Sequence, residues 1–135
     1  MIVVDASVWV GSLIAQDVNH YISRRWLDQY TLSGGFVAAP LLLLAEVAGA
    51  VSRRLGSPQR GEQAADRLRR TAGLRLVSGD LAFGQTAARL AARLRLRGAD
   101  ATYVTVAHVL NVPLVTWDRE QHQRAASIVS VQTPV

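Results

Sequence analysis

The sequence contains no cysteine and no lysine, and these absences exclude several kinds of site. Without cysteine there is no thiol nucleophile, disulfide framework or cysteine-based zinc site. Since all 15 basic residues are arginine, a Walker-type phosphate loop and Schiff-base chemistry are also excluded. The longest apolar stretch, Phe36 to Ala45, is shorter than the roughly 20 residues of a membrane span. Asp5 interrupts the apolar N-terminus, so we expect no signal peptide and a cytoplasmic protein without membrane contact.

The charge balance is positive, with a net charge of +5 in 135 residues. An excess of this sign suits a polyanionic partner such as nucleic acid. Arginine usage in a GC-rich genome would give the same count without any binding role, so both explanations stay open. Apolar residues make up 50% of the chain. With glycine they exceed the usual share of about 45–50%, and we expect the surplus to be buried against another protein.

Short β-branched runs alternate with helical stretches along the chain. Strands are predicted over residues 2–4, 36–39, 74–77, 113–117 and 128–131. Helices are predicted over residues 7–15, 19–32, 40–55, 58–71, 81–96, 100–110 and 119–126. This alternation indicates an α/β fold with a mainly parallel sheet that helices cover on both faces. In such sheets the functional crevice lies beyond the carboxyl ends of the strands.

Three aspartates fall near that predicted crevice. Asp5 directly follows the first strand, Asp118 directly follows the fourth, and Asp100 opens a helix. The carboxyl ends of parallel strands share one edge of the sheet, so the first two side chains can converge there. Aspartate is also a preferred helix N-cap, and each residue taken singly fits that structural role equally well.

Glu46 lies inside the almost uniformly apolar helical stretch from Leu41 to Ala48. A buried carboxylate without a partner costs several kcal/mol, and no lysine is present to pair with it. The remaining partners for Glu46 are an arginine or a divalent cation. The candidate arginines are Arg53 and Arg54, which lie two turns away on the same predicted helix. Four carboxylates close together would repel one another unless a cation neutralised them. An oxygen-only ligand set favours Mg²⁺ or Mn²⁺ over zinc.

Four short motifs around these acids resemble those of PIN-domain ribonucleases, especially VapC-type toxins of VapBC toxin–antitoxin pairs. They occur in the expected order and span almost the whole chain: Ile2 to Val8, Pro40 to Val47, Gly98 to Val104 with Ala107, and Leu114 to Asp118. The resemblance implies one PIN-like nuclease domain over residues 1–135. It also implies a three-layer sandwich with four to five strands in a mainly parallel central sheet.

The same resemblance implies a metal-dependent endoribonuclease that hydrolyses RNA phosphodiesters with Mg²⁺ or Mn²⁺. Its catalytic residues would be Asp5, Glu46, Asp100 and Asp118, with the three aspartates as metal ligands and Glu46 as ligand or water-orienting base. Ser7 and Thr116 are placed to support the aspartates by hydrogen bonding. Many relatives carry further acids near the last two motifs, so the number of metal ions, one or two, stays open. The expected partners are RNA, a VapB-type antitoxin that neutralises the toxin, and a second copy in a homodimer.

Arginines at intervals of four suggest a track for the RNA backbone. Arg89, Arg93 and Arg97 follow one another along the helix predicted over 81–96 and its end. A solvated helix face would show the same row, and that interpretation is equally open. Two other functions also remain: a catalytically silent PIN-like module that binds RNA or protein, and, less well supported, a small-molecule phosphatase.

Overall fold

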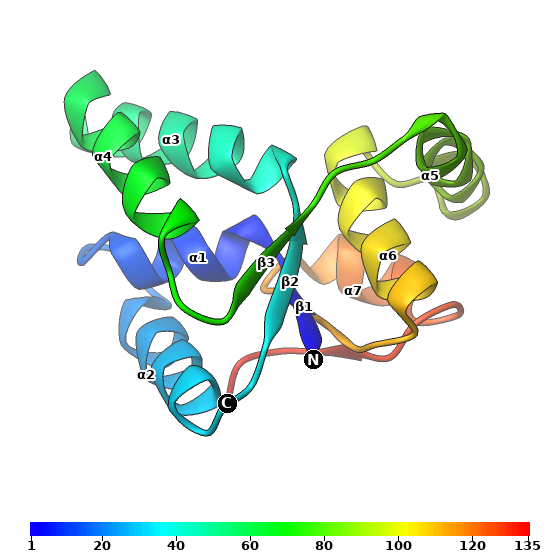
Figure 1. Cartoon of the computed structure of the whole chain (residues 1–135), viewed down its shortest axis with the longest axis horizontal. Coiled ribbons are helices and arrows are strands. Elements are labelled where there is room, and N and C mark those ends of the chain that lie inside the picture. The colour runs from blue at the N-terminus through cyan, green and yellow to red at the C-terminus, as the bar shows by residue number, and fades with distance from the viewer.

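The computed structural model describes residues 1–135 and contains a five-stranded sheet (Figure 1). The strands are β1 (Ile2–Val4), β2 (Val37–Pro40), β3 (Leu74–Val77), β4 (Leu114–Val115) and β5 (Val131–Gln132). Their order is β3-β2-β1-β4-β5, and every neighbouring pair is parallel. The predicted α/β class is therefore confirmed, with a sheet that is parallel throughout.

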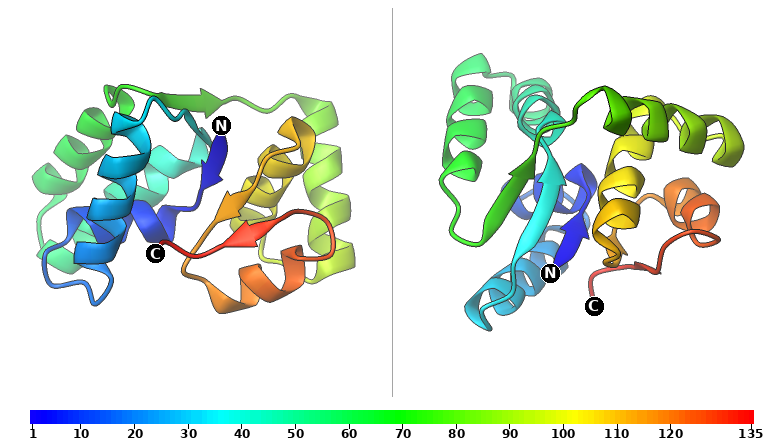
Figure 2. Two further views of the ribbon diagram at one scale, coloured as in Figure 1. Left: turned by 90° about the horizontal axis from the view of Figure 1, so that it is seen from below. Right: turned by 45° about the vertical axis from the view of Figure 1, so that its right-hand side comes forward.

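Seven helices cover the two faces of this sheet. They are α1 (Ala6–Leu13), α2 (His20–Leu32), α3 (Leu42–Leu55), α4 (Pro58–Arg69), α5 (Leu81–Leu94), α6 (Gly98–Leu110) and α7 (Arg119–Ala125). Helices α1 to α4 lie on one side and α5 to α7 on the other, which gives three layers (Figure 2). None of these helices combines the length and the apolar character that a membrane span requires.

The core is built from the short strands and from α6, which packs against β1, β2 and β4. Val3, Val4 and Val37 are fully buried, as are Tyr103 and Val104 of α6. Strands covered on both faces need apolar residues at successive positions, which explains the unbroken Ile-Val-Val run of β1.

The strand order changes direction between β1 and β4, and we call the region beyond the carboxyl ends of these two strands the β1–β4 crevice. The chain runs from β1 outward to β2 and β3, then returns through α5 and α6 to β4 on the other side of β1. The connections that leave β1 and β4 therefore diverge to opposite sides of the sheet. This divergence is the position at which open parallel sheets place their ligands, and Asp5 and Asp118 follow these two strands.

Several predicted boundaries differ from the structure, including the start of α6, which begins at Gly98 and not at Asp100, and two further differences have a clear local cause. Helix α5 ends at Leu94 because Arg95 adopts the left-handed conformation, with φ 54°, and caps the helix. Arg97 consequently leaves the helical row and becomes the extended residue that precedes α6. The last strand is β5 at Val131–Gln132, because the backbone N–H groups of Ile128 and Val129 bond to the carbonyl of Ala125 in a turn after α7.

Candidate active site

Asp5 is held from two directions at the end of β1. Its Oδ2 accepts a hydrogen bond from the backbone N–H of Ser7 at 2.9 Å and caps α1. The Thr116 hydroxyl donates to the same oxygen at 3.3 Å. The residue is only 5% exposed. The capping and the active-site interpretations are therefore compatible, since the cap leaves Oδ1 on the side of α7.

Gln121 of α7 provides the contact to that second oxygen. It is fully buried, and its amide nitrogen lies 3.5 Å from Asp5 Oδ1 and 3.4 Å from the backbone carbonyl oxygen of Asp100. Its own Oε1 is buried without a hydrogen-bond partner. Gln121 was not predicted as a site residue from the sequence. The available signal was a glutamine three residues after Asp118, which the capping pattern accounted for without a functional role.

Asp100 and Asp118 are joined by one arginine. Arg97 Nε donates to Asp100 Oδ2 and Arg97 Nη2 donates to Asp118 Oδ2, each at 2.9 Å. Asp118 also caps α7 by accepting from the N–H of Gln121 at 2.8 Å. Burial raises the pKa of Asp100 above its usual value, and Asp5 and Asp118 add to this effect, although Arg97 opposes it.

Glu46 reaches the same region from α3 and is paired with a tyrosine. The Tyr103 hydroxyl donates to Glu46 Oε2 at 2.5 Å across the two sides of the sheet. Burial raises the pKa of Glu46, the hydrogen bond from Tyr103 lowers it, and the charges of Asp5 and Asp100 raise it further. The net direction is upward, toward neutral pH.

The arginines considered as partners for Glu46 are engaged elsewhere. Arg54 forms an ion pair with Asp17 at 2.6 Å, and the guanidinium of Arg53 folds over Gly49. Pairing of Glu46 with Arg53 or Arg54 is therefore wrong, and a neutral hydroxyl takes that place. Burial and the neighbouring Glu46 raise the pKa of Tyr103, so its proton stays in the hydrogen bond. Tyr103 was also missed, although it lies one helical turn from Asp100.

Ser7 and Thr116 link the two aspartates that follow β1 and β4. Thr116 Oγ1 accepts from the backbone N–H of Asp118 at 3.0 Å while it donates to Asp5. Ser7 Oγ accepts from the N–H of Trp117 at 3.1 Å and lies 3.4 Å from Thr116 Oγ1. Thr116 therefore hydrogen-bonds the carboxylate of Asp5 and the backbone of Asp118, but not the carboxylate of Asp118.

The three arginines of the predicted track separate in the structure. Arg89 and Arg93 are exposed on α5, where Arg89 donates to Thr86 Oγ1 at 3.2 Å. Arg97 turns toward the carboxylates instead of continuing that face. The interpretation of Arg89 and Arg93 as RNA contacts stays a prediction, and Arg97 stands apart from them.

The candidate site offers the type of ligand that a hard cation such as Mg²⁺ prefers, because every charged ligand is a carboxylate. As the side chains lie, no group of three histidine or acidic residues is arranged to hold a metal ion. Arg97 occupies the place of a cation there, because it binds one oxygen of Asp100 and one of Asp118. The unpaired Oε1 of Gln121 adds a further buried acceptor near Asp5.

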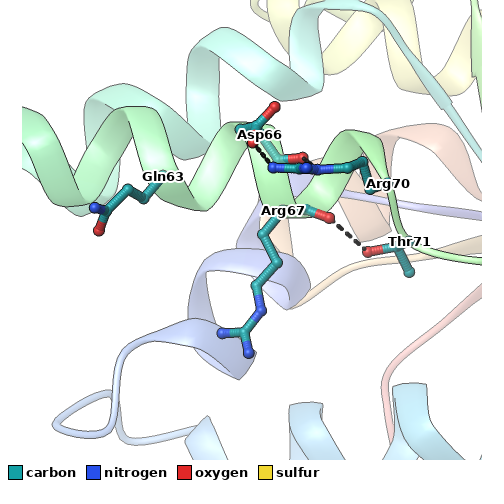
Figure 3. A pocket seen from close by; sticks show the side chains of 5 residues that line it. All are labelled: Gln63, Asp66, Arg67, Arg70 and Thr71. Carbon is teal, nitrogen blue, oxygen red and sulfur yellow. Dashed lines mark hydrogen bonds and ion pairs between the residues drawn. The ribbon is translucent and has the colours of Figure 1, made fainter.

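A hollow elsewhere on the surface offers no comparable chemistry. Figure 3 shows it along α4, lined by Gln63, Asp66, Arg67, Arg70 and Thr71. Its single acid, Asp66, forms ion pairs with both Arg69 and Arg70. The carboxylate there is already balanced, so the β1–β4 crevice is the stronger candidate.

The model of the PIN domain family matches residues 2–127. The chain belongs to the PIN domain family. No curated protein sequence matches it significantly.

Among solved structures, VapC20 of Mycobacterium tuberculosis, described as a Sarcin-Ricin loop cleaving toxin, is 23% identical with a TM-score of 0.79, covering 98% of this chain and 99% of that one. VapBC2 of Rickettsia felis, bound to a promoter DNA fragment, is 16% identical with a TM-score of 0.74 and covers 98% of both chains. FitAcB of Neisseria gonorrhoeae is 22% identical with a TM-score of 0.67, covering 99% of this chain and 98% of that one.

At these identities the solved structures establish the fold of this PIN domain, which confirms the predicted PIN-like architecture. The assignment of individual residues to metal binding and catalysis stays a prediction.

Proposed function

We propose that this PIN domain is a metal-dependent endoribonuclease that hydrolyses RNA phosphodiester bonds. The observation that carries the proposal is a set of four carboxylates at the β1–β4 crevice. Asp5, Asp100 and Asp118 share Gln121 and Arg97 as neighbours. Glu46, held by Tyr103, lies near enough for the charges of Asp5 and Asp100 to raise its pKa. A structural relative described as a Sarcin-Ricin loop cleaving toxin supports RNA as the substrate class.

Each side chain has a role that its surroundings support. Asp5, Asp100 and Asp118 would hold Mg²⁺ or Mn²⁺, with Thr116 and Gln121 fixing the orientation of Asp5. The bound cation would neutralise charge on the phosphate and lower the pKa of water. Glu46 accepts a proton from the attacking water, because its raised pKa brings it nearer to neutral pH than an ordinary glutamate. Tyr103 keeps that carboxylate in place.

The proposed biological role is the toxin of a type II toxin–antitoxin pair, acting in the cytoplasm. Relatives of this fold include VapBC and toxin–antitoxin complexes, which supports a VapB-type antitoxin as the partner. An arginine supplied by such a partner would suit the acidic crevice electrostatically.

The test is cleavage of total RNA by the purified protein with and without Mg²⁺ or Mn²⁺. We expect metal-dependent cleavage, and near-complete loss of it in Asp5→Asn, Glu46→Gln and Asp100→Asn. Asparagine at position 5 can still cap α1, and the changes at Glu46 and Asp100 remove no cap, so melting curves on the same samples should show folded protein. RNA binding without cleavage in the unaltered protein would support the catalytically silent module instead.

We also propose that the protein forms a homodimer. Helix α2 exposes large apolar side chains, with Tyr21 72% and Ile22 43% accessible. A surface of this kind is costly to leave in water. Light scattering at micromolar concentration should give twice the mass of one chain. A strictly monomeric species under those conditions would contradict the dimer.

A further inference from the structure

Arg97 supplies the positive charge of the candidate site from within the chain. None of the other ion pairs of the structure involves any of the four carboxylates. Arg97 is the one basic residue that forms an ion pair with any of the four, and it binds two of them with different nitrogens of one guanidinium group. Both contacts use the Oδ2 oxygen of an aspartate that the proposed function assigns to the metal.

We propose that Arg97 is a displaceable internal cation that couples metal binding to RNA binding. It neutralises Asp100 and Asp118 in the metal-free protein, leaves them when the metal ion binds, and then contacts the RNA phosphate. This inference rests on the proposed function, because it takes these aspartates as the metal ligands.

The geometry allows such an exchange. The backbone of Arg97 is fixed, since its carbonyl accepts from the N–H of Ala101 at 2.9 Å at the start of α6. The side chain is 71% exposed, whereas those of Asp100 and Asp118 are 15% and 27% exposed. Exposed ion pairs contribute little to stability and are readily replaced. A divalent cation, held by both carboxylates, can therefore displace the guanidinium without moving the helix.

The released guanidinium has an evident new ligand. It stays tethered beside the crevice, where a phosphodiester bound at the metal would offer it an anionic ligand. Arginine binds phosphate through two parallel N–H···O contacts, which lysine cannot reproduce. In the metal-free protein the same nitrogens are occupied, so RNA gains this contact only after metal binding.

The first measurement is Mn²⁺ affinity, followed through the electron paramagnetic resonance signal of the free ion. We expect Arg97→Gln to bind Mn²⁺ roughly three- to tenfold more tightly than the unaltered protein, because no side chain competes for the carboxylates. Arg93→Gln removes the same charge from the end of α5 and should leave the affinity unchanged. Arg97→Lys retains the charge without the planar fork and should also bind more tightly. Wild-type affinity in Arg97→Gln would show that the guanidinium does not compete with the metal ion, and would overturn the exchange.

The second measurement observes Arg97 directly. In ¹⁵N-labelled protein, the Arg97 Nε–H resonance is assigned by its absence in Arg97→Gln. Saturation with Mg²⁺ should shift this resonance and speed its exchange with water, as the hydrogen bond to Asp100 breaks. An unchanged resonance while Mg²⁺ binds would overturn the inference and leave the proposed function standing. Failure of the unaltered protein to bind either ion would contradict the proposed function itself.

The third measurement is RNA affinity in a Glu46→Gln background, in which we expect the RNA to stay intact. Adding Arg97→Gln should weaken RNA binding roughly three- to tenfold in Mg²⁺ and leave it unchanged in a metal chelator. Equal weakening under both conditions would show that Arg97 contacts RNA independently of the metal, and the coupling would be wrong.

Discussion

At the scale of single residues, Glu46 carries a conflict between folding and function. It is half-buried, faces the charges of Asp5 and Asp100, and has one neutral donor in Tyr103. Burial and these charges raise its pKa in the folded protein above the value in the unfolded chain. The folded state therefore binds the proton more tightly, and ionisation of Glu46 above its unfolded pKa lowers the free energy of unfolding.

This sign gives a stability prediction for Glu46→Gln. Glutamine still accepts the hydrogen bond from Tyr103 but cannot ionise. We expect the metal-free variant to be more stable than the unaltered protein at pH 7, with the difference vanishing below the pKa of an unfolded glutamate. Chemical denaturation across this pH range measures it. Glu62→Gln, at an exposed position on α4, is the control and should show no such dependence. A variant less stable than the parent at pH 7 would contradict the burial argument.

The residues that the sequence predicted differ in kind from those it missed. Asp5 and Asp118 could be placed because each follows a predicted strand, and parallel strands bring their ends together. Tyr103 and Gln121 were missed, and Arg97 was predicted only as an RNA contact. All three act at the site through side-chain hydrogen bonds, and the one from Tyr103 to Glu46 spans 57 positions of sequence. No local pattern specifies such a contact, since it depends on the distance between α3 and α6.

At the scale of elements, periodicity and turn residues predicted every strand and helix but misplaced some ends. The C-terminus of α3 followed from Gly56, which has φ 62° and caps that helix. Helix α5 ends without a glycine, because Arg95 takes the left-handed conformation at φ 54°. Arginine gives no signal for that conformation. The predicted helix was therefore too long, and Arg97 was wrongly placed on one helix face with Arg89 and Arg93.

The packing of α3 against α4 depends on one glycine. A Cβ on Gly61 would overlap the Ala48 carbonyl oxygen and lie 2.9 Å from Ser52 Cβ, both on α3. We expect Gly61→Ala to lower the free energy of unfolding by about 1–3 kcal/mol, because one helix must shift. Gly84→Ala, in α5 with open space around the position, is the matched control. It should raise stability by about 0.5–1 kcal/mol through helix propensity. Equal effects of the two changes in denaturant titrations would contradict the close approach.

At the scale of the whole molecule, the arginines lie in different settings at its two ends. Helices α4 and α5 are at opposite ends of the long axis (Figure 1). At the α4 end, Arg69 and Arg70 share Asp66 as their acidic partner, whereas Arg60 and Arg67 form no ion pair. On α5, Arg89 and Arg93 have no acidic partner within ion-pair distance. Helix α5 also packs on α6, the helix that carries Asp100 and Tyr103. A polyanion bound at the crevice would therefore find unpaired charge on the α5 side.

This asymmetry predicts the salt dependence of RNA binding. Replacing Arg89 and Arg93 with glutamine should weaken RNA binding regardless of sequence. It should also reduce the slope of log affinity against log salt by about 0.7 for each phosphate of a single strand that the variant no longer neutralises. The control is Arg69→Gln with Arg70→Gln, which removes the same net charge at the α4 end and should preserve the slope. If both double variants change the slope equally, only the net charge of the protein matters. An unchanged slope in the Arg89 and Arg93 double variant would assign these side chains to a solvated helix face, because counterion release counts only the phosphates that the protein neutralises.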